Sequence, residues 1–155
     1  MVRLANHEDI ASIMRLLHQV NDVHADSRPD LFIHGHTKYT SEQVAQLLED
    51  KDMRIFVFVD EKDEVKGHGF CIIQDHTKDE HLAQIRTLYI DDICVDSECR
   101  GQNIGKMLFQ AIKEYAKAEG FHNLTLNVWS GNEGAIRFYE KMGLRPFKIG
   151  MEQIL

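Results

Sequence analysis

Residues 100–106 form a polar segment with two glycines, and the stretch that follows has the spacing of an amphipathic helix: Arg100-Gly101-Gln102-Asn103-Ile104-Gly105-Lys106. A helix N-terminus presents unpaired backbone N–H groups and the positive end of the helix dipole, so this junction can bind a phosphate. Two nucleotide-binding motifs do not fit. A Walker loop needs about four residues between its glycine and the Gly-Lys pair, and only Gln102, Asn103 and Ile104 intervene here. The dinucleotide fingerprint G-x-G-x-x-G is also missing.

Two adjacent acids, Asp91 and Asp92, lie inside an apolar stretch that predicts a strand. Acidic residues are disfavoured in strands. A carboxylate at such a position can accept a proton from a reacting amine, or it can form a salt bridge with a neighbouring strand. Because successive side chains of a strand point to opposite faces, we expect at most one of the two to face a reacting group.

The segment Arg100-x-x-Asn103-x-Gly105 resembles the acyl-CoA loop of the GNAT acetyltransferase superfamily, which has Arg or Gln, two residues, Gly, one residue, and Gly or Ala. This chain has Asn103 where that pattern has glycine, and asparagine is one of the few other residues that adopt positive φ readily. Residues 132–144 are similar to the family signature N-x-x-A-x-x-x-Y-x-x-x-G followed by an aromatic or aliphatic residue. The resemblance covers nearly the whole chain and is strongest toward members that act on small amines and polyamines.

The resemblance implies transfer of an acetyl group from acetyl-CoA to an amine of a small, cationic acceptor by direct attack. Backbone groups at the end of the predicted strand would contact the pantetheine arm and the thioester, and the N–H groups of the glycine loop would hold the pyrophosphate. Asn132 matches a cofactor-binding position, although it is also a good cap for the helix that follows. The implied cofactor-binding residues are Ile93, Cys94, Val95, Arg100, Gly101, Gln102, Asn103, Ile104, Gly105, Lys106, Asn132 and Tyr139.

Catalytic roles follow from the same resemblance. Tyr139 matches the proton donor to the departing thiolate, and its ordinary pKa near 10 keeps it protonated at neutral pH; without the motif it would be a packing residue. Asp91 matches the cleft-side acid of polyamine acetyltransferases and is the expected base, acting through water, with Asp92 as its structural partner. Asp26 and His34, between the first and second helices, would line the acceptor site together with Asp91, unless they lie in a solvated loop.

Two other functions remain open. One is acetylation of a protein N-terminus or of a lysine side chain. Ribosomal-protein alanine acetyltransferases place a glutamate base at the position that matches Asn127, and asparagine cannot take a proton there. The other is a catalytically silent module that binds acyl-CoA.

The elements that must position these residues alternate along the chain, with no repeat or linker. The resemblance implies an α/β fold with a mixed sheet of six to seven strands and about four helices, in the order β-α-α-β-β-β-α-β-α-β. Periodicity and capping residues predict helices over residues 8–20, 40–50, 104–119 and 133–142. Apolar runs predict strands over residues 54–60, 65–74, 83–95 and 123–129, with a terminal strand within residues 144–155. Residues 21–38 are predicted to form a loop or a short irregular helix.

Composition narrows the class of protein. With 155 residues, we expect one domain. The net charge of −7 opposes binding to nucleic acid, and it divides unevenly. Residues 1–99 hold ten Lys and Arg against twenty Asp and Glu, while residues 100–148 hold eight against four, so an acidic amine-facing part precedes a basic phosphate-facing part.

The remaining expectations concern location and partners. Cys71, Cys94 and Cys99 lack paired spacing and should be reduced, and no apolar run approaches the about 20 residues that span a bilayer. We therefore expect a cytoplasmic protein with no membrane partner. No histidine spacing favours a metal site. The family resemblance adds a possible homodimer.

Overall fold

The computed structural model describes residues 1–155, and its central element is a five-stranded sheet. In chain order the elements are β1 (Val2–Leu4), the 3₁₀ turn η1 (His7–Asp9), α1 (Ile10–Ser27), α2 (Ser41–Glu49), β2 (Met53–Val59), β3 (Val65–Asp75), β4 (Arg86–Val95), the 3₁₀ turn η2 (Ser97–Cys99), α3 (Ile104–Ala118), β5 (Asn123–Leu126) and α4 (Glu133–Lys141). The α/β class and the four helices are confirmed.

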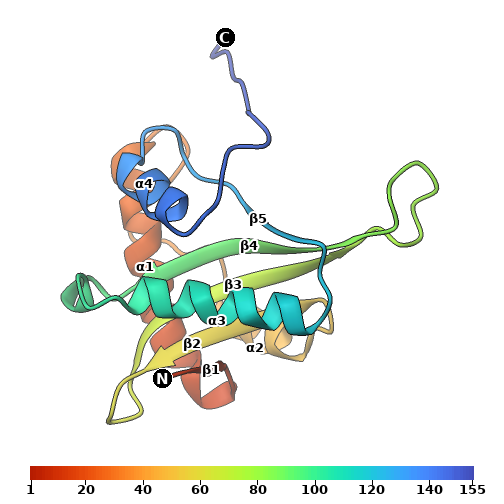
Figure 1. The fold of residues 1–155 in the computed structure, drawn as a ribbon. Helices are drawn as coiled ribbons and strands as arrows, with labels where there is room; N and C mark the ends of the chain where they lie inside the picture. The colour runs from red at the N-terminus through yellow and green to blue at the C-terminus, as the bar shows by residue number, and fades with distance from the viewer.

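The strands follow one another across the sheet in the order β1-β2-β3-β4-β5. The first four are antiparallel neighbours, and β5 runs parallel to β4. Figure 1 shows α3 lying across one face of the sheet and α1 and α2 behind the other. Two apolar cores result, one between the sheet and the α1–α2 layer and one between the sheet and α3.

Local sequence explains where the helices begin. The side chain of Thr40 accepts a hydrogen bond from the Gln43 N–H, and the Gln43 side chain accepts one from the Thr40 N–H, which is the expected capping box of α2. Asn132 caps α4 in a similar way, through the Ala135 N–H. No side chain caps α3.

The first helix continues beyond its predicted end at residue 20 and runs to Ser27. Ala25 is fully buried and extends the apolar face of Leu17 by two turns, and no glycine or proline interrupts the chain before Pro29. Of the polar residues between Leu17 and Ala25, only His18 is exposed and the others are partly buried. The prediction of a loop or a short irregular helix over residues 21–38 is therefore corrected for residues 21–27, which continue α1.

The sheet has five strands rather than six to seven, because β5 ends at Leu126 and no strand forms within residues 144–155. Phe147, Ile149 and Met151 alternate as in a strand, but they are 71%, 78% and 90% exposed. A strand needs a neighbouring edge to pair with, and this segment projects away from the sheet (Figure 1). None of the helices combines the length and the apolar content that would let it cross a membrane.

Candidate active site

The candidate site lies where β4 and β5 separate. Their parallel pairing runs from Thr87 with Asn123 to Ile90 with Leu126 and then stops. β4 continues to Val95, paired only with β3 on its other side. The backbone of residues 91–95, which includes Ile93, Cys94 and Val95, is therefore free of a strand partner on its β5 side. Unpaired strand edges of this kind bind extended amide-containing chains.

The loop that follows β4 adopts the backbone that its residues predict. Gly101 has φ +80°, and Asn103 has φ +61° in the left-handed region. Asparagine tolerates this region better than most residues, so it replaces glycine without breaking the turn. Because α3 lacks a side-chain cap, the N–H groups of its first turn remain available to an anion.

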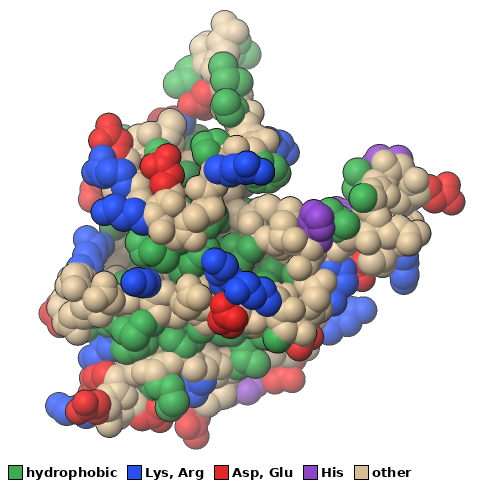
Figure 2. All heavy atoms as spheres, viewed as in Figure 1, with side chains coloured by type: hydrophobic (Ala, Val, Ile, Leu, Met, Phe, Trp, Pro, Cys, Tyr) green, Lys and Arg blue, Asp and Glu red, His purple; other side chains and the backbone are tan.

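The loop, the strand end and α4 together enclose a surface hollow of about 270 Å³. Figure 2 shows apolar side chains in the hollowed surface between α3 and α4, with Lys and Arg side chains around it. Most of the predicted cofactor-binding loop is found here, whereas Gln102 is exposed outside the lining and Asn132 lies at the start of α4. The lining residues are Val95, Cys99, Arg100, Gly101, Asn103, Ile104, Gly105, Lys106 and Phe138.

Asn132 is engaged as a helix cap. Its Oδ1 accepts a hydrogen bond from the Ala135 N–H at 3.1 Å. Asn132 therefore has the helix-capping role that the sequence also allowed for it. Its Nδ2 donors are not used by that bond and remain able to reach a ligand.

Tyr139 lies on the face of α4 that packs toward α3. Its ring contacts the rings of Phe109 and Phe138, at centroid distances of 6.3 and 5.1 Å. Burial, and then the negative charge of Asp92, raise the pKa of Tyr139 to about 12. The hydroxyl is therefore protonated throughout the neutral range, as a proton donor must be.

A bulge in β4 changes the expected directions of the two acids. Phe70 of β3 pairs with Asp92, but the next residue, Cys71, pairs with Ile90, so Asp91 is an extra residue without a cross-strand partner. A bulge interrupts the alternation of a strand. Both carboxylates consequently contact residues on the α1–α2 side of the sheet, and the prediction that they point to opposite faces is wrong.

Asp91 is held by two residues from the segment between α1 and α2. Its Oδ2 lies 2.6 Å from Lys38 Nζ and 3.4 Å from the Tyr39 hydroxyl. The Asp91 side chain is only 11% exposed, against 54% for Lys38. Burial lowers the pKa of Lys38, but the bond and charge of Asp91 outweigh that effect and raise it above its ordinary value.

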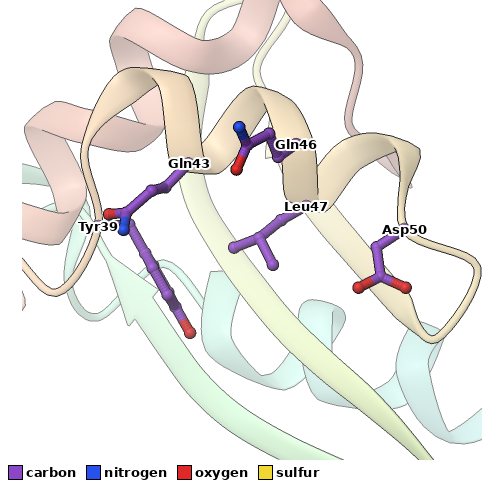
Figure 3. A pocket seen from close by; sticks show the side chains of 5 residues that line it. All are labelled: Tyr39, Gln43, Gln46, Leu47 and Asp50. Carbon is purple, nitrogen blue, oxygen red and sulfur yellow. The ribbon is translucent and has the colours of Figure 1, made fainter.

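Tyr39 sits at the border of a second surface hollow, of about 280 Å³, along α2. Figure 3 shows Tyr39 and Gln43 at one end of that hollow, Gln46 and Leu47 along the helix, and Asp50 at the other end. The ring stacks on Phe70 at a centroid distance of 5.8 Å. Burial, and then the charge of Asp91, raise the pKa of the Tyr39 hydroxyl.

Asp92 is held by a histidine that the sequence did not single out. Its Oδ2 lies 2.7 Å from Nε2 of His68, whose side chain is fully buried. His68 Nδ1 has no hydrogen-bond partner, and Nε2 donates the hydrogen bond that the Asp92 carboxylate accepts. The ring also packs edge-on against Phe70, at 5.1 Å.

Sequence patterns offered only weak signals for these contacts. His68 alternates with Phe70 in a strand pattern, which places both on one face. Lys38 and Tyr39 stand directly before the α2 capping box. Nothing in either pattern shows which carboxylate they would contact.

Asp26 and His34 come together, but they make no contact with the acid pair. His34 lies 3.3 Å from Asp26 and 3.4 Å from Asp22, and all three side chains are largely exposed. Neither Asp26 nor His34 makes an ion pair or hydrogen bond with Asp91. No group of three or more His, Cys, Asp or Glu side chains is arranged to hold a metal ion.

A partly buried ion pair fixes the strand end to α1. Arg15 donates a hydrogen bond to Asp96, the residue after β4, and Gln19 Nε2 donates a second at 3.4 Å. Although burial raises the pKa of Asp96, the Arg15 bond and the Glu98 N–H lower it below its ordinary value. The start of the phosphate loop is thus anchored to the helical layer that also positions Lys38.

Comparisons with known proteins identify the fold and the family of this chain. A tetramutant of the BH1408 protein from Bacillus halodurans has a crystal structure that matches with a TM-score of 0.93 and 31% identity, over 100% of this chain and 99% of that one. The thialysine N-epsilon-acetyltransferase of Sus scrofa is 35% identical over 39% of this chain and 35% of its own length. The putative ribosomal protein bS18-alanine N-acetyltransferase of Bacillus subtilis is 36% identical over 44% of this chain and 50% of its own length.

These two curated relatives are thus matched over half of their length or less. The family model described as acetyltransferase (GNAT) matches residues 17–144, which include β2 to β5, the glycine loop and α4. The chain therefore belongs to the acetyltransferase (GNAT) family.

Proposed function

We propose that this protein is an N-acetyltransferase that moves an acetyl group from acetyl-CoA to the primary amine of a small, cationic acceptor. The observation that carries this proposal is the ion pair between Lys38 Nζ and Asp91 Oδ2, 2.6 Å apart where β4 and β5 separate. A lysine ammonium is chemically a primary alkylammonium ion. The contact therefore supports the proposal that the Asp91 carboxylate can hold the acceptor's ammonium group in the same way.

The opposite side of β4 supports acetyl-CoA as the donor. The unpaired edge of residues 91–95 offers backbone groups to the amides of a pantetheine arm. The uncapped first turn of α3, with Arg100 and Lys106 beside it, suits a pyrophosphate. One bound molecule would then extend from the phosphate loop to the acid pair.

Asp91 and Tyr139 supply the two proton transfers that the reaction needs. Asp91 accepts a proton from the acceptor's ammonium, directly or through water, so that the nitrogen lone pair can attack the thioester carbon. Tyr139 gives its hydroxyl proton to the sulfur as the C–S bond breaks. The raised pKa of Tyr139, about 12, keeps that proton in place until the thiolate forms.

Two relatives bear on the choice of acceptor. The name of the pig relative describes acetylation of an epsilon nitrogen, which matches the alkylammonium proposed here. The name of the Bacillus subtilis relative describes acetylation of a protein alanine, and it supports a protein N-terminus as a second candidate. Asn127 favours the first, because its amide cannot take a proton and is hydrogen-bonded to the Tyr89 hydroxyl at 3.2 Å.

The test is the release of free thiol from acetyl-CoA in the presence of polyamines, lysine and thialysine, aminoglycosides, and peptides with free N-termini. We expect turnover with small alkylamines and much less with peptides. Turnover on peptides alone would favour the second candidate. Binding of CoA without turnover on any amine would indicate a silent binding module, and absence of CoA binding would overturn the proposal.

A further inference from the structure

Lys38 occupies the position that the proposed function gives to an external amine. Its nitrogen contacts Asp91 at 2.6 Å and lies 5.4 Å from the centroid of the Tyr39 ring, so carboxylate and aromatic face together position the ammonium. Asp91 is the first residue of β4 beyond the last pair with β5. The ammonium is therefore tied to the point where the strands open.

No other lysine has a comparable environment. Lys66 and Lys117 pair with acids two to six positions away in sequence, at the surface. Lys38 reaches a carboxylate 53 positions away whose side chain is only 11% exposed. A contact over this separation reflects the tertiary fold rather than neighbouring surface charge.

We propose that Lys38 is a site of self-acetylation, modified on Nζ by acetyl-CoA bound to the same chain. This inference rests on the proposed function, because it uses the same donor and the same carboxylate. It adds a second acceptor, built into the protein, that competes with the external amine for Asp91.

The reaction is balanced by groups already described. The Lys38 ammonium gives one proton to Asp91, and the neutral nitrogen attacks the acetyl carbon of acetyl-CoA. The N–C bond forms, the C–S bond breaks, and the nitrogen loses its second proton to water. The thiolate of CoA takes a proton from Tyr139, which is reprotonated by solvent.

Two consequences follow from the charge change. An acetylated Lys38 is neutral and cannot keep its ion pair, so Asp91 loses its intramolecular cation. Before modification, Asp91 raises the pKa of Lys38, so the neutral amine is scarce at neutral pH. Self-acetylation should therefore accelerate as pH rises.

The experiment incubates the full chain with acetyl-CoA and no added amine, from neutral to mildly alkaline pH. Intact mass and peptide mapping follow the modification. We expect one acetyl group per chain, on Lys38, with a first-order rate that does not depend on protein concentration. Lys38→Arg should stay unmodified, the exposed control Lys62→Arg should behave as wild type, and Asp91→Asn should slow the reaction about 100-fold.

A cationic small amine in excess should suppress the modification in proportion to its occupancy of the site. Thiol release with small amines while Lys38 stays unmodified would overturn this inference and leave the proposed function intact. Equal labelling of Lys62 and Lys38, or a rate proportional to protein concentration, would also overturn it. Absence of CoA binding by calorimetry would remove both proposals.

Discussion

The two sides of β4 recognise ligands by different means. On the α3 side, the candidate cofactor site consists mainly of backbone: an unpaired strand edge, a loop with two residues at positive φ, and an uncapped helix turn. On the α1–α2 side, the candidate acceptor site consists of side chains that hold one another, Lys38 and Tyr39 on Asp91 and His68 on Asp92.

This difference predicts how each side responds to mutation. A backbone site depends on φ and ψ, so most side-chain changes there should have modest effects. In a site made of ion pairs and hydrogen bonds, each substitution removes one partner. The remaining polar group then stays partly buried without a hydrogen bond, which is energetically unfavourable. Changes on the acceptor side should therefore have the larger effects.

The largest effect is expected from Asp91→Asn. Asparagine keeps the size of the side chain but cannot accept the acceptor's proton. We expect kcat/KM for a small amine to fall by about 100- to 10,000-fold. The control is Asp79→Asn in the β3–β4 loop, which should keep wild-type activity. An Asp91→Asn enzyme with an unaltered pH–rate profile would show that the acceptor side does not contain this base.

Tyr139→Phe is expected to act next most strongly, and on kcat rather than on cofactor binding. The change removes the proton donor but keeps the ring against Phe109. We expect kcat to fall about 100-fold with the affinity for acetyl-CoA retained. Because burial and Asp92 raise the pKa of Tyr139 to about 12, deprotonation of this residue should not limit the wild-type rate at any pH well below that value.

Tyr115→Phe is the matched control, since Tyr115 packs in the same apolar cluster but its hydroxyl bonds Arg54 at 2.8 Å. That variant should lose about 1 kcal/mol of unfolding free energy and keep its turnover number. Equal turnover for Tyr139→Phe and wild type would remove Tyr139 from the mechanism.

The two sides also differ in what the sequence revealed. Residues 100–106 could be interpreted from the sequence because a turn with positive φ needs particular residue types. Glycine and asparagine, found at positions 101 and 103, are such types. The capping box of α2 was visible for the same reason. Local rules of this kind act over a few residues, so spacing is enough to predict them.

The acceptor side depends on contacts that no local pattern encodes. A bulge adds one residue to β4, and the alternation of side chains gives no sign of it before the register is known. Lys38 meets Asp91 only because the chain folds β4 beneath the α1–α2 segment. The predicted terminal strand failed in the opposite sense, since its alternation was present but the segment projects away from the sheet and pairs with no strand.

A smaller effect, on stability, tests whether His68 supports the acid pair. His68→Leu leaves the Asp92 carboxylate without its donor in a half-buried position, whereas His68→Gln keeps an N–H group of similar reach. We expect the leucine variant to lose about 1–3 kcal/mol of unfolding free energy in urea and the glutamine variant clearly less. Equal loss in both variants would mean that His68 stabilises the protein through the packing of its ring against Phe70 rather than through the bond to Asp92.

The smallest effect is expected at Asn103, and it separates a backbone role from a side-chain role on the cofactor side. At φ +61°, alanine costs about 1 kcal/mol more than glycine, so Asn103→Ala should weaken acetyl-CoA binding several-fold in calorimetry. Asn103→Gly should bind at least as tightly as wild type, because it adopts the turn freely. Should the glycine variant bind as weakly as the alanine variant, the Asn103 amide would have to contact the cofactor directly. The phosphate loop would then depend on a side chain, as the acceptor side does.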